Sequence, residues 1–200
     1  MNQPLGVILA GGQATRMGGG DKGLLMLGDT TILTHVIARL DPQVAGMALN
    51  ANGASARFEA YRLPVLPDSV KGFVGPLAGV LAGLDWAAET GADSIVTVAA
   101  DTPFFPCDLV PRLQLAGEGM AHPLVLARTP DGRHPTFGLW PVALREDLRT
   151  ALQNGIRKVV MWTDQHDGRS AMFDDQGEPF FNVNTPEDLI CAQDMLERGA

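Results

Sequence analysis

Residues 9–22, LAGGQATRMGGGDK, contain the residue types that bind an anion. The stretch holds five glycines, which let backbone N–H groups converge on phosphate oxygens. The guanidinium of Arg16 can chelate two oxygens, and Lys22 supplies a point charge on a flexible arm. Two cations in a glycine-rich stretch that follows an apolar run therefore predict a phosphate-binding loop rather than a surface loop with accidental charges.

The spacing of this loop separates it from two common nucleotide-binding motifs. A dinucleotide fingerprint needs G-x-G-x-x-G leading directly into a helix, whereas Gly11 and Gly12 are adjacent and the next helix is predicted only from residue 31. A P-loop needs G-x-x-x-x-G-K-[ST], whereas Lys22 follows Asp21 and precedes Gly23. A long, irregular phosphate loop remains.

Asp101 is the candidate metal ligand. It follows the run SIVTVAA at residues 94–100, which is the strongest strand pattern in the chain. Mg²⁺ keeps several waters and takes one or two protein carboxylates together with substrate phosphates. One aspartate at a strand end beside a phosphate loop meets that demand. The alternative is that Asp101 only begins a turn, since Asp-Thr-Pro is itself a turn sequence.

The elements that position these residues alternate between strand and helix. Strands are predicted at residues 5–10, 44–49, 63–67, 94–100, 125–127, 135–140 and 171–173, and helices at 31–40, 54–61, 75–89, 106–116, 142–153, 156–163 and 186–198. The alternation predicts one domain over residues 1–200 with a three-layer α/β/α fold and a mostly parallel central sheet. Ligands of such folds gather at the carboxyl ends of strands, where Gly11, Asn50, Asp68 and Asp101 are expected.

Composition and charge exclude several function classes. The chain has 200 residues, 46% of them hydrophobic and 19% charged, which suits a folded domain with a real core. Its net charge of -8 and pI near 4.8 argue against broad binding to nucleic acid or an anionic membrane. Two cysteines far apart in sequence form neither a metal pattern nor a disulfide framework. Because the N-terminal residues lack a basic region and their apolar run is too short for a bilayer, we expect a soluble cytoplasmic protein.

Residues 9–22 resemble the signature loop of the nucleotidyltransferases with a GT-A-like fold, LAGG-x3-RMG-x2-DK. Further segments resemble that superfamily in the same order over nearly the whole chain: Asn50 with Asn52, Asp68, GPLAG at 75–79, DTP at 101–103, HPT at 134–136 and FNVNTP at 181–186. The loop alone marks the superfamily. The combination of HPT with NVNTP is most similar to the molybdenum cofactor guanylyltransferases within it.

The resemblance implies a Rossmann-like nucleotidyltransferase fold whose N-terminal half binds GTP and whose C-terminal half binds molybdopterin. It implies transfer of GMP from GTP to molybdenum-molybdopterin, which forms the guanine dinucleotide cofactor and pyrophosphate. The phosphate oxygen that attacks is already anionic near neutral pH, so positioning and charge neutralisation carry the reaction. We therefore expect Asp101, through Mg²⁺, together with Arg16 and Lys22, to be the catalytic residues.

The same resemblance assigns the binding residues one by one. Backbone groups of Leu9, Ala10 and Gly11, with Gly12, would line the guanine and phosphate end, and Lys22 would hold phosphate. Asn50 and Asp68 would sit around the nucleoside. The molybdopterin would face Asn182 and Asn184, with His134, Arg157 and Lys158 as further candidates.

These acceptor-side residues have alternative roles. Asn182 and Asn184 alternate with Val183 and so share one face of an extended segment, but both would also serve as turn and capping residues before the last helix. His134, which precedes a proline and so lies in extended backbone, would also serve as a hydrogen-bonded structural histidine.

Three other functions compete with guanylyl transfer. A cytidylyltransferase for the same pterin tends to carry LAAG where this chain has LAGG, and a sugar-phosphate nucleotidyltransferase is usually longer. A non-catalytic nucleotide-binding carrier would need no metal-binding carboxylate, so Asp101 argues against it. The expected partners are GTP, molybdenum-molybdopterin and, transiently, molybdopterin-handling proteins or molybdoenzyme chaperones. We expect the chain itself to be a monomer.

Overall fold

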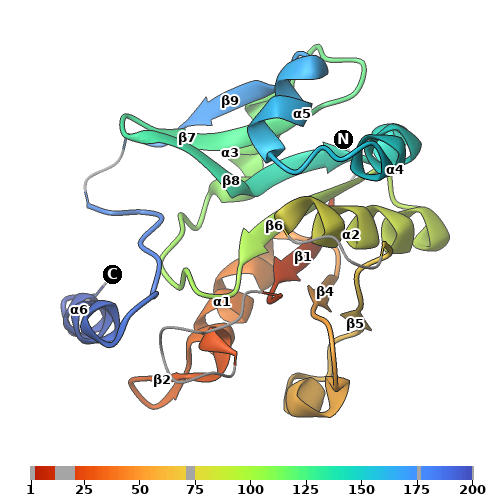
Figure 1. Ribbon diagram of the computed structural model, residues 1–200. Coiled ribbons are helices and arrows are strands. Elements are labelled where there is room, and N and C mark those ends of the chain that lie inside the picture. Colours follow the sequence, from red (N-terminus) through yellow and green to blue (C-terminus); the bar gives the residue numbers. More distant parts are fainter. Residues whose placement is uncertain (1–2, 12–20, 71–74, 175–176, 200) are drawn as a thin grey trace.

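A seven-stranded sheet forms the centre of the computed structural model, which describes residues 3–11, 21–70, 75–174 and 177–199 (Figure 1). The strands in spatial order are β5 (Val65–Leu66), β4 (Met47–Asn50), β1 (Leu5–Leu9), β6 (Ser94–Ala99), β8 (Gly132–Pro141), β7 (Val125–Thr129) and β9 (Arg169–Met172). Every neighbouring pair is parallel except the two that involve β8. The prediction of a mostly parallel sheet is confirmed.

The central strands are continuously apolar because both faces of the sheet are covered. Successive side chains of a strand point to opposite faces, so Val7 of β1 packs into one core and Ile8 into the other. Ile95 and Val96 of β6 divide in the same way. The sheet therefore separates two hydrophobic cores.

Helices supply the outer two layers. One core is covered by α1 (Ile32–Leu40) and α3 (Leu109–Ala116). The other is covered by α2 (Pro76–Thr90), α4 (Arg145–Gln153) and α5 (Val159–Gln165) (Figure 1). This arrangement confirms the predicted three-layer architecture.

Two helix starts follow from local sequence. The Thr31 side chain accepts a hydrogen bond from the backbone N–H of Thr34, which caps α1. The apolar side chains of Ile32, Val36 and Leu40 on this helix are buried. Helix α2 begins at Pro76, whose missing N–H costs nothing in a first turn.

The strand β8 runs opposite to its neighbours. It pairs antiparallel with β6 on one side and with β7 on the other. Its first residues therefore lie at the edge of the sheet where β6 and β7 end. This reversal places His134, near the beginning of β8, on the same edge as residues that follow β1, β4 and β6.

Several small elements were not predicted from the sequence. These are the 3₁₀ helices η2 (Lys22–Leu24) and η3 (Asp41–Gln43) and a two-stranded hairpin that joins β2 (Met26–Leu27) to β3 (Thr30–Thr31). The helix predicted at 54–61 is the 3₁₀ helix η4 (Ser55–Tyr61), and the helix predicted from residue 142 begins with the 3₁₀ helix η5 (Val142–Leu144) before α4. The expectation that no helix begins before residue 31 is thus wrong for the short turn η2. Elements of two or three residues contain too few positions to show a hydrophobic period.

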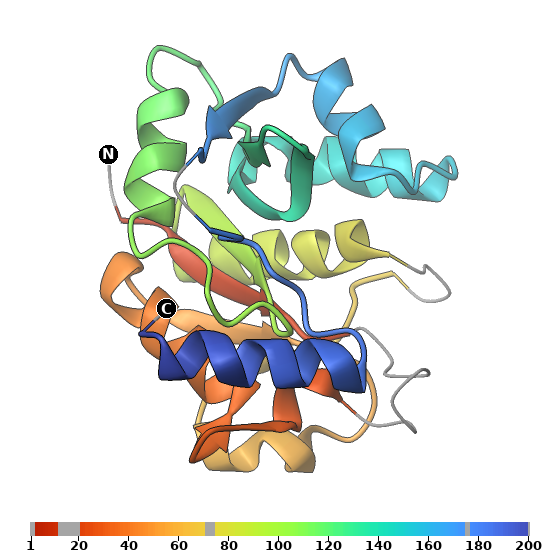
Figure 2. The same ribbon diagram turned by 90° about the vertical axis from the view of Figure 1, so that its left-hand side faces the viewer.

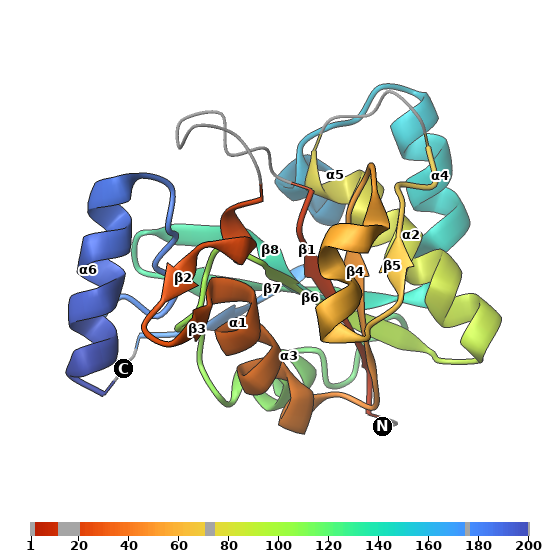
Figure 3. The ribbon, with the colours of Figure 1, turned by 90° about the horizontal axis from the view of Figure 1, so that it is seen from below.

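The last helix, α6 (Pro186–Glu197), lies at the margin of the molecule beside the β2–β3 hairpin (Figures 2 and 3). The Gly28 backbone N–H in this hairpin donates to Gln193 Oε1 at 2.9 Å. A reciprocal capping box between Thr185 and Asp188 starts α6. Within the described residues, the model contains no helix that is both long and apolar enough to cross a membrane.

Candidate active site

The carboxyl ends of three adjacent strands bring the predicted site residues together. The Ala10 N–H donates to the Asn50 carbonyl at 2.8 Å, and the Ala100 N–H donates to the Leu9 carbonyl at 3.1 Å. Asn50 ends β4, and Asp101 follows β6 by two residues. The sequence prediction that these residues share one edge of the sheet is confirmed.

Lys22 and Asp101 form the polar centre of this edge. Lys22 Nζ lies 3.2 Å from Asp101 Oδ2 and also donates to Asn184 Oδ1. The two charged side chains are 18% and 24% exposed, so solvent still reaches both. Residues from three distant parts of the chain thus place one cation, one carboxylate and one amide in direct contact.

The segment at residues 182–184 is held against Asp101 by backbone and side-chain contacts. The Val183 N–H donates to the Asp101 carbonyl at 2.9 Å. The hydroxyl of buried Thr102 donates to Asn182 Oδ1. Asp188 accepts hydrogen bonds from the backbone N–H groups of Asn184 and Thr185, both at 2.9 Å, and the hydrogen bond from Asn184 is the main cause of the lowered pKa of Asp188. Helix α6 is capped by Thr185 rather than by either asparagine. The side chains of Asn182 and Asn184 instead contact Thr102 and Lys22, so this segment matches the predicted site location and not the alternative capping role.

A second polar cluster lies beside β4 and β5. Asn50 Nδ2 donates to Asp68 Oδ1 at 2.9 Å and to the Leu66 carbonyl at 3.1 Å. Asn52 Nδ2 donates to Asp68 Oδ2 at 2.8 Å, and Asn52 Oδ1 accepts from the Asp68 N–H at 3.0 Å. The side chains of Asn50 and Asn52 therefore orient the Asp68 carboxylate directly.

Helix α2 touches this cluster through Gly79. A Cβ at that position would lie 2.2 Å from Asn50 Oδ1 and 2.8 Å from a methyl group of Leu9. Such distances are far inside van der Waals contact, so only glycine leaves Asn50 in its present place. The GPLAG segment thus contributes space to the site rather than a functional group.

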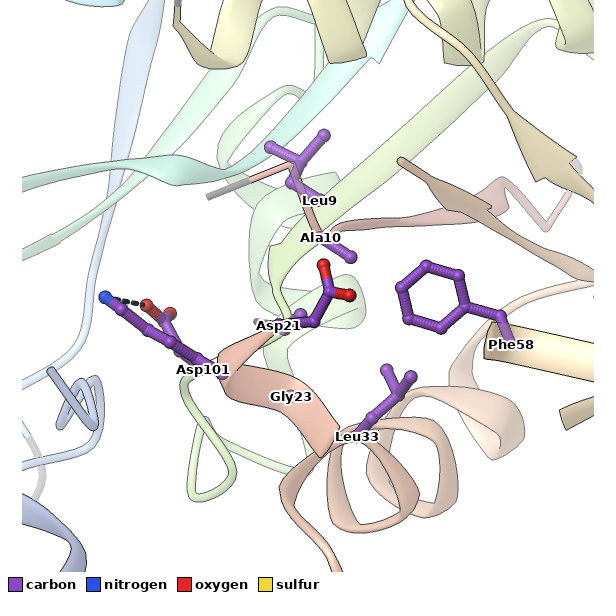
Figure 4. A pocket seen from close by; sticks show the side chains of 9 residues that line it. Leu9, Ala10, Asp21, Gly23, Leu33, Phe58 and Asp101 are labelled. Carbon is purple, nitrogen blue, oxygen red and sulfur yellow. Dashed lines mark hydrogen bonds and ion pairs between the residues drawn. The ribbon is translucent and has the colours of Figure 1, made fainter. Parts of the chain in front are cut away.

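A small hollow lies between the Lys22–Asp101 pair and β1 (Figure 4). Its volume of about 40 Å³ leaves room for a few water-sized groups. Figure 4 shows the Asp21 carboxylate and the Phe58 ring beside it, below Ala10. The lining residues are Leu9, Ala10, Asp21, Lys22, Gly23, Leu33, Phe58, Ala100 and Asp101.

His134 lies in a separate pocket of about 350 Å³ that shares no lining residue with the hollow. Its ring stacks on Phe180 with centroids 4.3 Å apart, and its Nε2 lies 3.0 Å from Thr129 Oγ1. Burial lowers the pKa of His134 from its ordinary value of 6.5, although the nearby Asp131 carboxylate acts in the opposite direction. Phe181 also lines this pocket, and Asn182 follows it in the chain, so one segment connects the two cavities.

Other predicted residues are placed less centrally or lie outside the described residues. Arg157 Nη1 donates to the carbonyls of Leu152 and Ile156, which holds it against the end of α4, and exposed Lys158 precedes α5. Gly11 is exposed just beyond β1. Gly12 and Arg16 lie outside the described residues, so their predicted roles stay predictions.

The described residues include no group of three or more His, Cys, Asp or Glu side chains that could hold a metal. The oxygen donors near Asp101 are its own carboxylate and the amide oxygens of Asn182 and Asn184. These are hard ligands, and Mg²⁺ takes its other ligands from water and substrate phosphate. The residues present therefore fit a magnesium ion that is bound together with a nucleotide.

Phe58, which lines the hollow, and its neighbour Arg57 were not identified as site residues in the sequence analysis. Phe58 and Arg57 lie on η4, for which the sequence suggested only a short helix. Arg57 forms an ion pair with Asp21 in which Nε lies 2.5 Å from Oδ2. An arginine 36 positions from its partner carries no local signal, so no spacing rule could have found the pair.

Comparison with known proteins settles the family. The family model described as "MobA-like NTP transferase domain" matches residues 6–168. The chain belongs to the MobA-like NTP transferase family.

Curated members of this MobA-like family resemble the chain over nearly its whole length. A molybdenum cofactor guanylyltransferase of Bradyrhizobium sp. (strain ORS 278) is 51% identical over 94% of this chain and 91% of its own. One from Cereibacter sphaeroides is 49% identical over 98% of both chains. In structure, the molybdopterin-guanine dinucleotide biosynthesis protein A from Archaeoglobus fulgidus superimposes with a TM-score of 0.79 at 24% identity, over 97% of this chain and 99% of that one. The last likeness confirms the MobA-like fold.

Proposed function

We propose that this protein transfers GMP from GTP to molybdenum-molybdopterin, which yields the molybdopterin guanine dinucleotide cofactor and pyrophosphate. The observation that carries the proposal is the meeting of Lys22, Asp101 and Asn184 at the carboxyl edge of the sheet. Full-length relatives named molybdenum cofactor guanylyltransferase support the choice of nucleotide and acceptor.

The reaction needs positioning and charge neutralisation more than proton transfer. An anionic oxygen of the molybdopterin phosphate attacks the α-phosphorus of GTP, and the bond between that phosphorus and the bridging oxygen to the β-phosphate breaks. The electron pair of the broken bond leaves with pyrophosphate. Lys22, and Arg16 as expected from the sequence, would offset the negative charge that grows on this leaving group.

Asp101 would hold Mg²⁺, with the oxygens of Asn182 and Asn184 close enough to orient its waters. When bound, this ion supplies charge neutralisation and a template for the phosphate oxygens. Lys22 and Asp101 neutralise each other without substrate. Each would exchange its protein partner for a phosphate or a metal when the nucleotide enters.

The nucleoside would lie beside Asn50 and Asp68, which the amide of Asn52 orients. Backbone groups of Leu9, Ala10 and Gly11 would approach the guanine and phosphate end, since Leu9 and Ala10 line the hollow beside Lys22 and Asp101. Gly12 would extend this contact.

The pterin end of the acceptor would occupy the pocket of His134. Its volume of about 350 Å³ and its aromatic walls of Phe180 and Phe181 suit a planar heterocycle that stacks. Asn182 and Asn184 follow directly along the chain and would face the part of the molybdopterin that carries the phosphate. The segment 180–184 would thus bring the attacking oxygen to the α-phosphate.

Pyrophosphate release tests this function directly. The purified protein is given GTP, CTP or ATP with Mg²⁺, each with and without molybdenum-molybdopterin. We expect release only with GTP and the acceptor together. A preference for CTP would instead identify a cytidylyltransferase, and nucleotide binding without release from any mixture would identify a carrier.

A further inference from the structure

Arg57 has an unusually complete set of partners for a side chain that the proposed mechanism does not use. Its Nε lies 2.5 Å from Asp21 Oδ2, and its Nη2 donates to the Asn52 carbonyl at 2.8 Å. Its Nη1 donates to the Ala54 carbonyl, and the guanidinium lies over the Phe58 ring at 4.5 Å from the centroid. The planar guanidinium is therefore fixed on several sides at once.

These contacts join the two ends of the proposed nucleotide site. Asp21 directly precedes Lys22, the residue that would hold phosphate. Asn52 orients Asp68, which would lie beside the nucleoside. Arg57 contacts Asp21 and the Asn52 backbone, so one side chain sets the position of the phosphate end relative to the nucleoside end.

The negative charge of Asp21 gives a second reason for the Arg57 guanidinium at this position. The Asp21 side chain lines the hollow and is only 18% exposed. An unpaired carboxylate there would repel the phosphates of an incoming nucleotide. The Arg57 guanidinium cancels that charge within hydrogen-bond distance.

We propose that Arg57 is a positioning residue for nucleotide binding, which acts through Asp21 by holding Lys22 in place and by neutralising the Asp21 carboxylate. The proposal rests on the proposed function insofar as that function puts nucleotide phosphates at Lys22. It does not depend on which acceptor the enzyme uses.

A double-mutant cycle between Arg57 and Asp21 tests the proposal. The variants are Arg57→Ala, Asp21→Asn and the pair, each assayed for KM and kcat with the nucleotide that the wild-type enzyme uses best among GTP, CTP and ATP. Loss of a charge-assisted contact predicts that Arg57→Ala raises KM about 10- to 100-fold. In the Asp21→Asn background the same substitution raises KM much less, because the charge that Arg57 neutralises is already gone.

Arg149→Ala is the matched control. Arg149 also forms an ion pair with N–O distance 2.5 Å, to Asp85, and its side chain is 28% exposed against 29% for Arg57. It joins α4 to α2 away from the hollow. We expect both arginine variants to lower the melting temperature to a similar degree, while only Arg57→Ala raises KM.

Two results would overturn the proposal. If Arg57→Ala behaves like Arg149→Ala, with lower stability and an unchanged KM, the residue is structural only. If its effect on KM is equally large with and without Asp21→Asn, Arg57 acts on the nucleotide by a route other than Asp21. If the wild-type enzyme works with a different nucleotide or acceptor, the proposed function is refuted. The double-mutant cycle can still be measured with that nucleotide, so the role of Arg57 is tested separately.

Discussion

Replacement of Lys22 by methionine separates the catalytic use of its charge from its use in folding. Coulomb's law gives about 5 kcal/mol for unit charges 3.2 Å apart at an effective dielectric constant of about 20. Hydration that both groups lose on pairing offsets most of this attraction, and partly exposed pairs stabilise proteins by roughly 0–1 kcal/mol. Methionine retains the apolar stem of lysine, so the fold of Lys22→Met should lose at most about 1 kcal/mol.

The effect on turnover should be much larger. In the proposed transition state, the Lys22 ammonium faces the negative charge that grows on the departing pyrophosphate. Removal of one such preorganised donor typically lowers kcat by roughly 10²- to 10³-fold. We therefore expect Lys22→Met to reduce kcat by about that factor while its melting temperature stays within a few degrees of the wild type.

Pyrophosphate release under saturating GTP and molybdenum-molybdopterin measures kcat, and urea unfolding measures stability on the same preparation. Arg149→Met serves as the control, because it removes a partnered cation of similar exposure from the α2–α4 contact. A folded Lys22→Met enzyme with near-wild-type kcat would refute the role of Lys22. Loss of several kcal/mol of stability would show that the Lys22–Asp101 pair is structural.

Three further predictions concern residues around the site. Gly79→Ala should displace Asn50 and raise the KM for GTP about tenfold. Gly83→Ala is the control, because a Cβ there would meet side-chain atoms of Val7 and Ile95. It should lower the free energy of unfolding without changing KM. Equal KM values for the two variants would contradict this role of Gly79. Burial lowers the pKa of His134 in the folded protein below its ordinary value of 6.5. As the pH falls through 6.5, the unfolded chain therefore binds a proton at His134 before the folded protein does. Wild-type stability should therefore decline below that pH more steeply than that of His134→Gln, as measured by urea unfolding between pH 7.5 and 5.5; parallel profiles would exclude the effect. Thr185→Ala should cost about 1 kcal/mol through loss of the α6 cap, measured by the same unfolding assay, with Thr185→Ser expected to restore it.

The elements predicted correctly are those with long or strongly apolar patterns. The helix from Ile32 has a full apolar stripe and a capping threonine, and β6 has an unbroken β-branched and alanine run, so local sequence is sufficient for both. The reversed direction of β8 was not predictable in this way. A strand pattern reports burial and period but not the direction in which the chain re-enters the sheet.

The candidate site also contains residues that local sequence predicts and residues that it does not. The positions of Asn50, Asp68 and Asp101 were predictable because each lies at or just after the end of a strand, and the carboxyl ends of parallel strands meet at one edge of the sheet. The partners Arg57 and Thr102 were not predicted, since their roles depend on contacts with Asp21 and Asn182 across 36 and 80 positions of the chain. Only the folded arrangement brings these residues into contact.

The reversal of β8 has an evolutionary consequence. The nucleotide side of the edge is built by the parallel strands β1, β4 and β6, whereas the His134 pocket is built around the turn between β7 and β8 and the segment that follows β9. Under the proposed function, the two halves of the reaction would therefore depend on different stretches of the gene. If the acceptor binds in this pocket as proposed, changes confined to residues 129–134 and 177–181 would alter which acceptor fits while Lys22 and Asp101 stay unchanged. The same phosphate-binding residues could then serve new acceptors.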